Sequence, residues 1–100
     1  MFGFGRKKDY AKEFKDGFEN TDVNKMISVT KEWQKKDPGD KNCSLAVCIL
    51  ALFSDDINPD HVKALYATSK NSTPTNKDLL PFFELTAAIM FKTKGIDIDL

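Results

Sequence analysis

Residues 43–53 read CSLAVCILALF, a run of eleven residues without a charged side chain. As an α-helix this run would be about 16 Å long, roughly half the thickness of the hydrocarbon core of a bilayer. It is therefore too short to cross a membrane. A helix that is apolar on all sides has to be covered by other parts of the chain. We therefore expect a helix from about Asn42 to Ser54 at the centre of a helical bundle.

Both cysteines of the chain, Cys43 and Cys48, lie in this run. Because they are five residues apart in the sequence, their side chains lie about 140° apart around a helix. Two ligands on one face of a helix would be three or four residues apart. A disulfide between them would require a broken helix, and the chain has no further cysteine to complete a metal site. We therefore expect two buried free thiols, no metal site and no cofactor.

Two helices are predicted before the central run. The first begins near Asp9, a residue type that is favoured as an N-cap. The second extends from about Thr21 to Lys36 and ends before the turn sequence DPGDK. Apolar and small side chains recur on one side of the second helix, which predicts its inner face. The residues of that face are Val23, Met26, Ile27, Thr30 and Trp33.

Two more helices are predicted after the central run. The sequence NPD at residues 58–60 combines an N-cap, a proline at the first helical position and an acid that suits the helix dipole. Residues 71–76, NSTPTN, have the composition of a loop. The last helix is expected to begin near Asp78 and to end at Gly95, which suits a left-handed terminal residue.

This pattern predicts an all-α fold of about five antiparallel helices. Shifts of 37 and 38 residues align an amphipathic helix followed by a more apolar one in each half of the chain, either as a true repeat or by chance. Such pairs would form helical hairpins in a tetratricopeptide- or HEAT-like bundle. We expect residues 1–100 to form one domain, with a flexible N-terminal arm (1–8) and a C-terminal tail (96–100) that either folds back onto the core or pairs with a partner.

The sequence contains no group of residues that favours an enzyme. Asp56, Asn58 and Asp60 alternate as in a calcium-binding loop, but His61 and Ala67 stand where that loop needs glycine and a bidentate glutamate. His61 is the only histidine, and no nucleophile or orienting residue accompanies it in sequence. We therefore expect a protein without catalytic activity.

The 15 basic and 15 acidic residues give a net charge of zero, but the two kinds of charge are not evenly distributed along the chain. If consecutive helices alternate in direction, one end of the bundle collects lysines and the other collects acidic residues. An acidic end would steer a basic partner protein toward this surface. The residues that we expect to contact the partner are Asp55, Asp56, Asp60, Asp97 and Asp99.

The chain starts with MFGFGRKK, which lacks the apolar segment of a secretory signal. We therefore expect a cytoplasmic protein without a transmembrane segment, with both cysteines reduced. Two phenylalanines beside three basic residues leave open contact with RNA or a membrane surface through this arm. Because the total charge is zero, nucleic acid is not the partner that we expect.

The small all-helical format, with the acidic segments DDINPD and GIDIDL, resembles the immunity proteins of bacterial contact-dependent growth inhibition and related polymorphic toxin systems. This resemblance implies a cytoplasmic protein that binds a cognate toxin domain, often a basic nuclease, and occludes its working surface. Many inhibitors of nucleases are clearly acidic, so the neutral total charge leaves a nuclease as target in doubt.

A tetratricopeptide-like adaptor or secretion chaperone that binds a peptide is the main alternative. It predicts an exposed apolar groove, or one lined by asparagine and lysine, between the hairpins. The immunity function predicts instead a flat or convex acidic surface. A function in RNA or membrane contact predicts binding that weakens steeply with salt.

Overall fold

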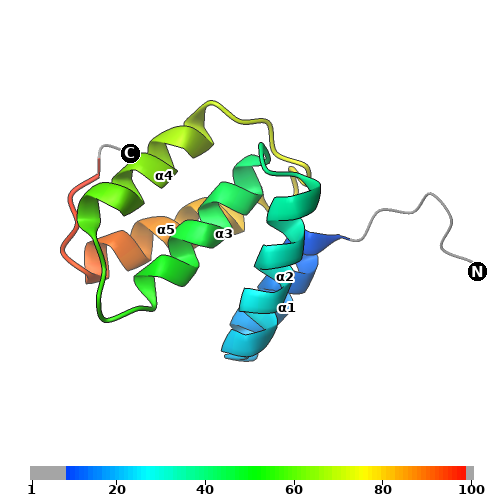
Figure 1. The fold of residues 1–100 in the computed structure, drawn as a ribbon, viewed down its shortest axis with the longest axis horizontal. Coiled ribbons are helices and arrows are strands. Elements are labelled where there is room, and N and C mark those ends of the chain that lie inside the picture. The colour runs from blue at the N-terminus through cyan, green and yellow to red at the C-terminus, as the bar shows by residue number, and fades with distance from the viewer. Residues whose placement is uncertain (1–8, 99–100) are drawn as a thin grey trace, which may run out of the picture.

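The computed structural model describes residues 9–98, which form five α-helices (Figure 1). The predicted all-α class with five helices is confirmed, and within residues 9–98 there is no strand beyond one isolated bridge between Asp40 and Thr73. None of the helices in this part of the chain is both long and apolar enough to span a membrane. The helices are α1 (Tyr10–Glu19), α2 (Val23–Lys36), α3 (Lys41–Leu52), α4 (Pro59–Lys70) and α5 (Leu80–Thr93).

Short polar side chains cap the first four helices. In each case a carboxylate or amide oxygen accepts a hydrogen bond from a backbone N–H of the first turn. The caps are Asp9, Asp22, Asp40 and Asn58. The predicted caps Asp9 and Asn58 are confirmed. The second helix begins later than predicted, because Thr21 has the left-handed φ of 55° and cannot belong to a helix.

The last helix begins and ends differently. No side chain caps α5 at its own first residue, and the Asn76 Oδ1 atom instead accepts hydrogen bonds from the backbone N–H groups of Asp78 and Leu79, at 3.0 and 3.3 Å. The helix therefore starts at Leu80, two residues after the predicted start. Gly95 follows it with a φ of +73°, as predicted for a left-handed residue at a helix end.

Helix α3, which carries the uncharged run, packs against each of the other four helices. Leu45, Ala46, Cys48, Ile49 and Leu52 are fully buried. The predicted central position of this helix is therefore confirmed. Helices α1 and α2 form one hairpin and α3 and α4 a second, while α5 packs against α3 (Figure 1). The resemblance of this layout to tetratricopeptide or HEAT repeats stays a prediction.

The inner face of α2 differs from the prediction. Val23 and Ile27 are 40% and 38% exposed, whereas Val29 is buried in their place. The reason is the close approach of α1, where a Cβ atom on Gly17 would lie 3.1 Å from the Met26 Cγ atom. This contact fixes the rotation of α2, and Val29 turns toward the core.

The chain after α5 folds back onto the bundle. Ile96 is buried and Ile98 is half-buried against the core, while Asp97 between them is exposed. The Ile96 N–H donates a hydrogen bond to the Phe91 carbonyl at 2.9 Å. Residues 1–8 of the predicted arm and residues 99–100 of the predicted tail lie outside the described residues.

Candidate functional site

Four of the five aspartates expected to contact a partner are described, and all four are exposed. Asp55 and Asp56 lie in the loop between α3 and α4, and Asp60 lies in the first turn of α4. Asp97 lies in the segment after α5, which Figure 1 shows in red at the same end of the long axis as the α3–α4 loop. Asp99 lies outside the described residues.

Hydrogen bonds to the backbone hold the α3–α4 loop in shape. The Ser54 Oγ atom accepts a hydrogen bond from the Asp56 N–H at 3.2 Å. The Asn58 Oδ1 atom accepts from the N–H groups of Asp60 and His61 at 3.0 and 3.3 Å. These bonds use backbone groups, so the carboxylates of the loop remain in water.

The exposed aspartates have no basic partner within residues 9–98. The ion pairs found there join Lys15 to Glu19 and Lys41 to Glu84, and neither involves the acidic end. Lys92 in the last turn of α5 and Lys94 directly after the helix are exposed and pair with none of these aspartates. The negative charge of this end is therefore not neutralised by contacts among the described residues.

The sequence did not predict the exposed apolar side chains beside the acidic end. Phe53, just before the acidic loop, is 41% exposed, and Leu85 and Ile89 on α5 are 63% and 56% exposed. Half-buried Phe82 precedes Leu85 by one helical turn. We call Phe53, Phe82, Leu85 and Ile89 the apolar strip. The only signal in the sequence is that α5 is apolar on more than one face, as expected of a buried helix.

Both cysteine thiols are buried and free, as predicted. Burial raises the pKa of Cys48 to about 12. Burial, together with the nearby carboxylates of Asp40 and Asp37, raises the pKa of Cys43 to about 12. Because only a thiolate is an effective nucleophile, these two side chains act as apolar packing groups at neutral pH.

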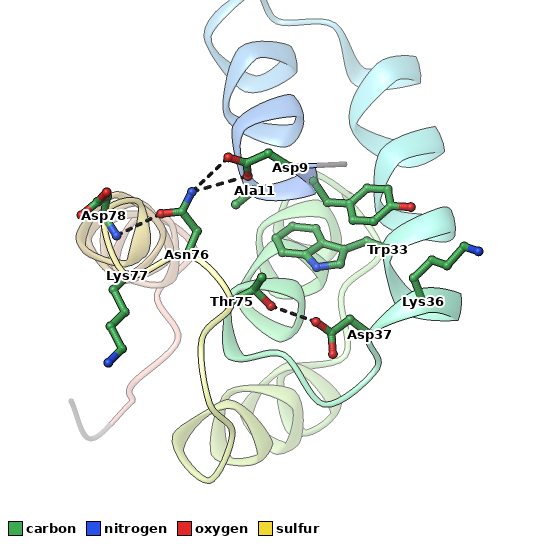
Figure 2. A pocket seen from close by; sticks show the side chains of 10 residues that line it. Asp9, Ala11, Trp33, Lys36, Asp37, Thr75, Asn76, Lys77 and Asp78 are labelled. Atoms are coloured by element: carbon green, nitrogen blue, oxygen red, sulfur yellow. Dashed lines mark hydrogen bonds between the residues drawn. The ribbon is translucent and has the colours of Figure 1, made fainter. Parts of the chain in front are cut away.

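A cleft of about 790 Å³ opens at the end of the α1–α2 hairpin where α1 begins and α2 ends (Figure 2). Its walls come from the start of α1, the end of α2 and the α4–α5 loop. Figure 2 shows the amines of Lys36 and Lys77 pointing away from the centre of the cleft. The ring of Tyr10 stacks on Trp33 at its inner wall, with 6.1 Å between the ring centroids.

Buried Asp40 holds the segments behind this cleft together. One carboxylate oxygen accepts a hydrogen bond from Trp33 Nε1 at 3.0 Å. The other accepts from the backbone N–H groups of Asn42 and Thr75, at 3.1 and 2.8 Å. Asp40 is only 1% exposed. It is therefore a structural group and not one of the surface charges of the bundle.

Further bonds join the same loops near the mouth of the cleft. The Thr75 hydroxyl donates to Asp37 at 2.8 Å, and the Asn76 side-chain amide donates to Asp9 at 3.1 Å (Figure 2). These contacts confirm that the α2–α3 and α4–α5 loops meet at one end of the bundle, as alternating helix directions predict. Sequence reasoning missed the cleft, because its walls come from segments that are far apart along the chain.

Comparison of this chain with protein families, curated proteins and solved structures finds no match.

Proposed function

We propose that this chain is a non-catalytic protein-binding module whose acidic end binds a basic partner protein. The observation that carries this proposal is that Asp55, Asp56, Asp60 and Asp97 are exposed at one end and have no ion pair within residues 9–98. Asp99 belongs to the same proposed surface by its place in the sequence. A surface of one sign attracts an oppositely charged partner and speeds their encounter.

The resemblance to immunity proteins extends this proposal to the role of the complex. The partner is then a basic toxin domain, and the module neutralises it by covering its working surface. Such a role requires no reaction by the module itself, in keeping with two thiols whose pKa values are raised to about 12. A stable complex also requires a rigid docking surface, and the capped α3–α4 loop supports this.

Affinity capture from the source cells, followed by mass spectrometry, tests the proposal. We expect one basic protein in equimolar amount, and we expect the double variant Asp55→Lys, Asp56→Lys to capture much less of it. Asp78→Lys is the control, because Asp78 is an exposed aspartate at the opposite end of the bundle. Equal capture by the wild-type chain and the double variant would refute binding through the acidic end.

The cleft supports a second candidate function, a peptide-binding adaptor. It lies between the first hairpin and the α4–α5 loop, and its lining combines Lys36, Asn76 and Lys77 with three aspartates, Asp9, Asp37 and Asp78. The same capture experiment separates the two functions. A partner held in the cleft would be lost with Asp78→Lys and retained by the Asp55→Lys, Asp56→Lys variant, which is the reverse of the first proposal.

A further inference from the structure

Helix α5 has one face in the core and another that other described helices leave uncovered. Phe83, Ala87 and Phe91 are buried on the face toward α3. Leu85 and Ile89 project from the opposite face, one helical turn apart, and are the two most exposed large apolar side chains of residues 9–98. Two aliphatic side chains at the centre of an outer helix face contribute nothing to the core.

Ring contacts make this face continuous with the end of α3. Phe18 lies between Phe53 and Phe82, with its ring centroid 6.0 Å from the first and 5.8 Å from the second. The apolar strip therefore runs from Phe53 across to α5. Beside Ile89 the surface is hollowed by about 340 Å³ between α5 and the segment that follows it, and Ile96 and Ile98 line the hollow.

The charges around the strip are not symmetric. Asp55 and Asp56 follow Phe53 by two and three residues, and both lack an ion pair within the described residues. Lys15 lies over the Phe82 ring, 5.3 Å from its centroid, but it is already paired with Glu19 at 2.9 Å. At the far end of the strip, exposed Lys92 follows Ile89 by three residues. Asp97 lies with Lys92 in the lining of the hollow beside Ile89, so the carboxylates without a lysine next to them are those of Asp55 and Asp56 at the Phe53 end.

We propose that the apolar strip is the energetic centre of the partner interface, and that the partner docks a basic amphipathic helix on it. This inference rests on the proposed function and specifies the chemistry of the partner. Its apolar side chains cover Leu85, Ile89 and Phe53, and its lysines or arginines face Asp55 and Asp56. Apolar anchors surrounded by charged residues are the usual anatomy of a specific interface.

Charge favours this occupant over a second copy of the chain. A second copy would add another set of unpaired aspartates to the interface, whereas a basic helix neutralises the set already present. The helix-in-groove mode also suits the geometry, because residues spaced three and four apart on the partner can follow Leu85 and Ile89 along α5.

The test uses a synthetic amphipathic peptide as long as α5, 14 residues, with leucines on one face and lysines on the other. We expect it to bind the full chain, and we expect Leu85→Ser with Ile89→Ser to weaken binding at least tenfold. The matched control is Val23→Ser with Ile27→Ser, because these aliphatic residues are also exposed and four apart, on α2. Circular dichroism verifies that every variant keeps its helices.

Two outcomes overturn the inference. If the peptide binds the Leu85→Ser, Ile89→Ser variant as tightly as the wild type, the strip is not the docking site. The proposed function still stands if the Asp55→Lys, Asp56→Lys variant no longer binds the peptide. It fails, independently of the apolar strip, if these two changes have no effect on peptide binding. If sedimentation shows a dimer that the Leu85→Ser, Ile89→Ser variant dissociates, a second copy covers the strip and the basic helix does not.

Discussion

At the scale of single residues, Asp40 is the side chain on which most of the local structure depends. It caps α3, fixes the indole of Trp33 and holds the backbone of Thr75, with three donors on one buried carboxylate. Asp37 and Asp40 are both aspartates of the DPGDK turn, so residue type alone does not show which of them is buried. The difference arises because Asp40 lies under the α4–α5 loop, and a contact so far along the chain cannot be read from local sequence.

Replacing Asp40 tests this role. We expect Asp40→Ala to lower the free energy of unfolding by about 2 to 4 kcal/mol, because it removes an N-cap and leaves buried N–H groups without an acceptor. Asp22→Ala removes an exposed cap of α2 and should cost only about 1 kcal/mol. Urea unfolding followed by circular dichroism measures both. Equal costs for the two variants would show that the buried contacts of Asp40 contribute little.

The Cys48 thiol predicts a pH dependence of stability. Burial raises its pKa in the folded chain to about 12 from an ordinary 9.0, so between these values the unfolded chain releases a proton that the folded chain keeps. The free energy of unfolding therefore falls as the pH rises above 9, by up to about 1.4 kcal/mol per pH unit from this group. Below pH 9 this contribution is fully present.

Unfolding measured at several pH values above 9, in the wild type and in Cys48→Ala, isolates the contribution of the thiol. We expect the variant to be less stable near neutral pH, because it leaves a small cavity, and to lose stability less steeply with pH. Parallel curves for the two proteins would contradict a buried, protonated thiol at this position. The modification rate of the thiols in the native protein is expected to follow unfolding.

At the scale of helices, the sequence predicted starts and ends better than faces. The caps Asp9 and Asn58 and the terminal Gly95 act through their immediate neighbours, so residue type was sufficient. The choice between Val29 and Ile27 on α2 depends on how closely α1 approaches at Gly17, which is a tertiary contact. The outer face of α5 was not predicted either. Apolar residues occur on more than one face of that helix, and the sequence does not show which of these faces packs against α3.

A comparison of Gly39 with Gly95 distinguishes the cost of a left-handed backbone from the cost of a steric clash. A Cβ atom would meet no heavy atom within 4 Å at either Gly39 or Gly95, but only Gly95 has a left-handed φ, of +73°. We expect Gly95→Ala to lower the free energy of unfolding by about 1 to 2 kcal/mol. Gly39→Ala should change it by less than about 0.5 kcal/mol. Thermal unfolding of the two variants makes the comparison, and similar melting temperatures would argue against a left-handed Gly95 as the end of α5.

At the scale of the whole molecule, a chain with no net charge presents two unlike ends. Acidic side chains without ion pairs gather around the α3–α4 loop, while the loops at the opposite end are bonded to one another around Asp40 and line a cleft. The sequence predicted this separation from helix direction alone. It could not predict that Asp40 is buried under the α4–α5 loop, or that Asp37, which stays partly exposed, accepts a hydrogen bond from the Thr75 hydroxyl.

This arrangement predicts how binding responds to salt. Attraction between exposed charges is screened over about 10 Å at 0.1 M salt, so association with a basic partner should slow as the salt concentration rises. Dissociation should change less, because apolar contacts at Leu85 and Ile89 are not screened. Surface plasmon resonance with the captured partner at several salt concentrations separates the two rates. An association rate independent of salt would argue against steering by the acidic end.

The most direct test of the central claim compares the low-salt association rate of the captured partner with three forms of the chain: wild type, Asp55→Lys with Asp56→Lys, and Asp78→Lys. We predict association at least tenfold slower for the double variant and nearly unchanged for Asp78→Lys, with the same helical content in all three. Equal slowing by Asp78→Lys, or none by the double variant, would contradict recognition through the acidic end.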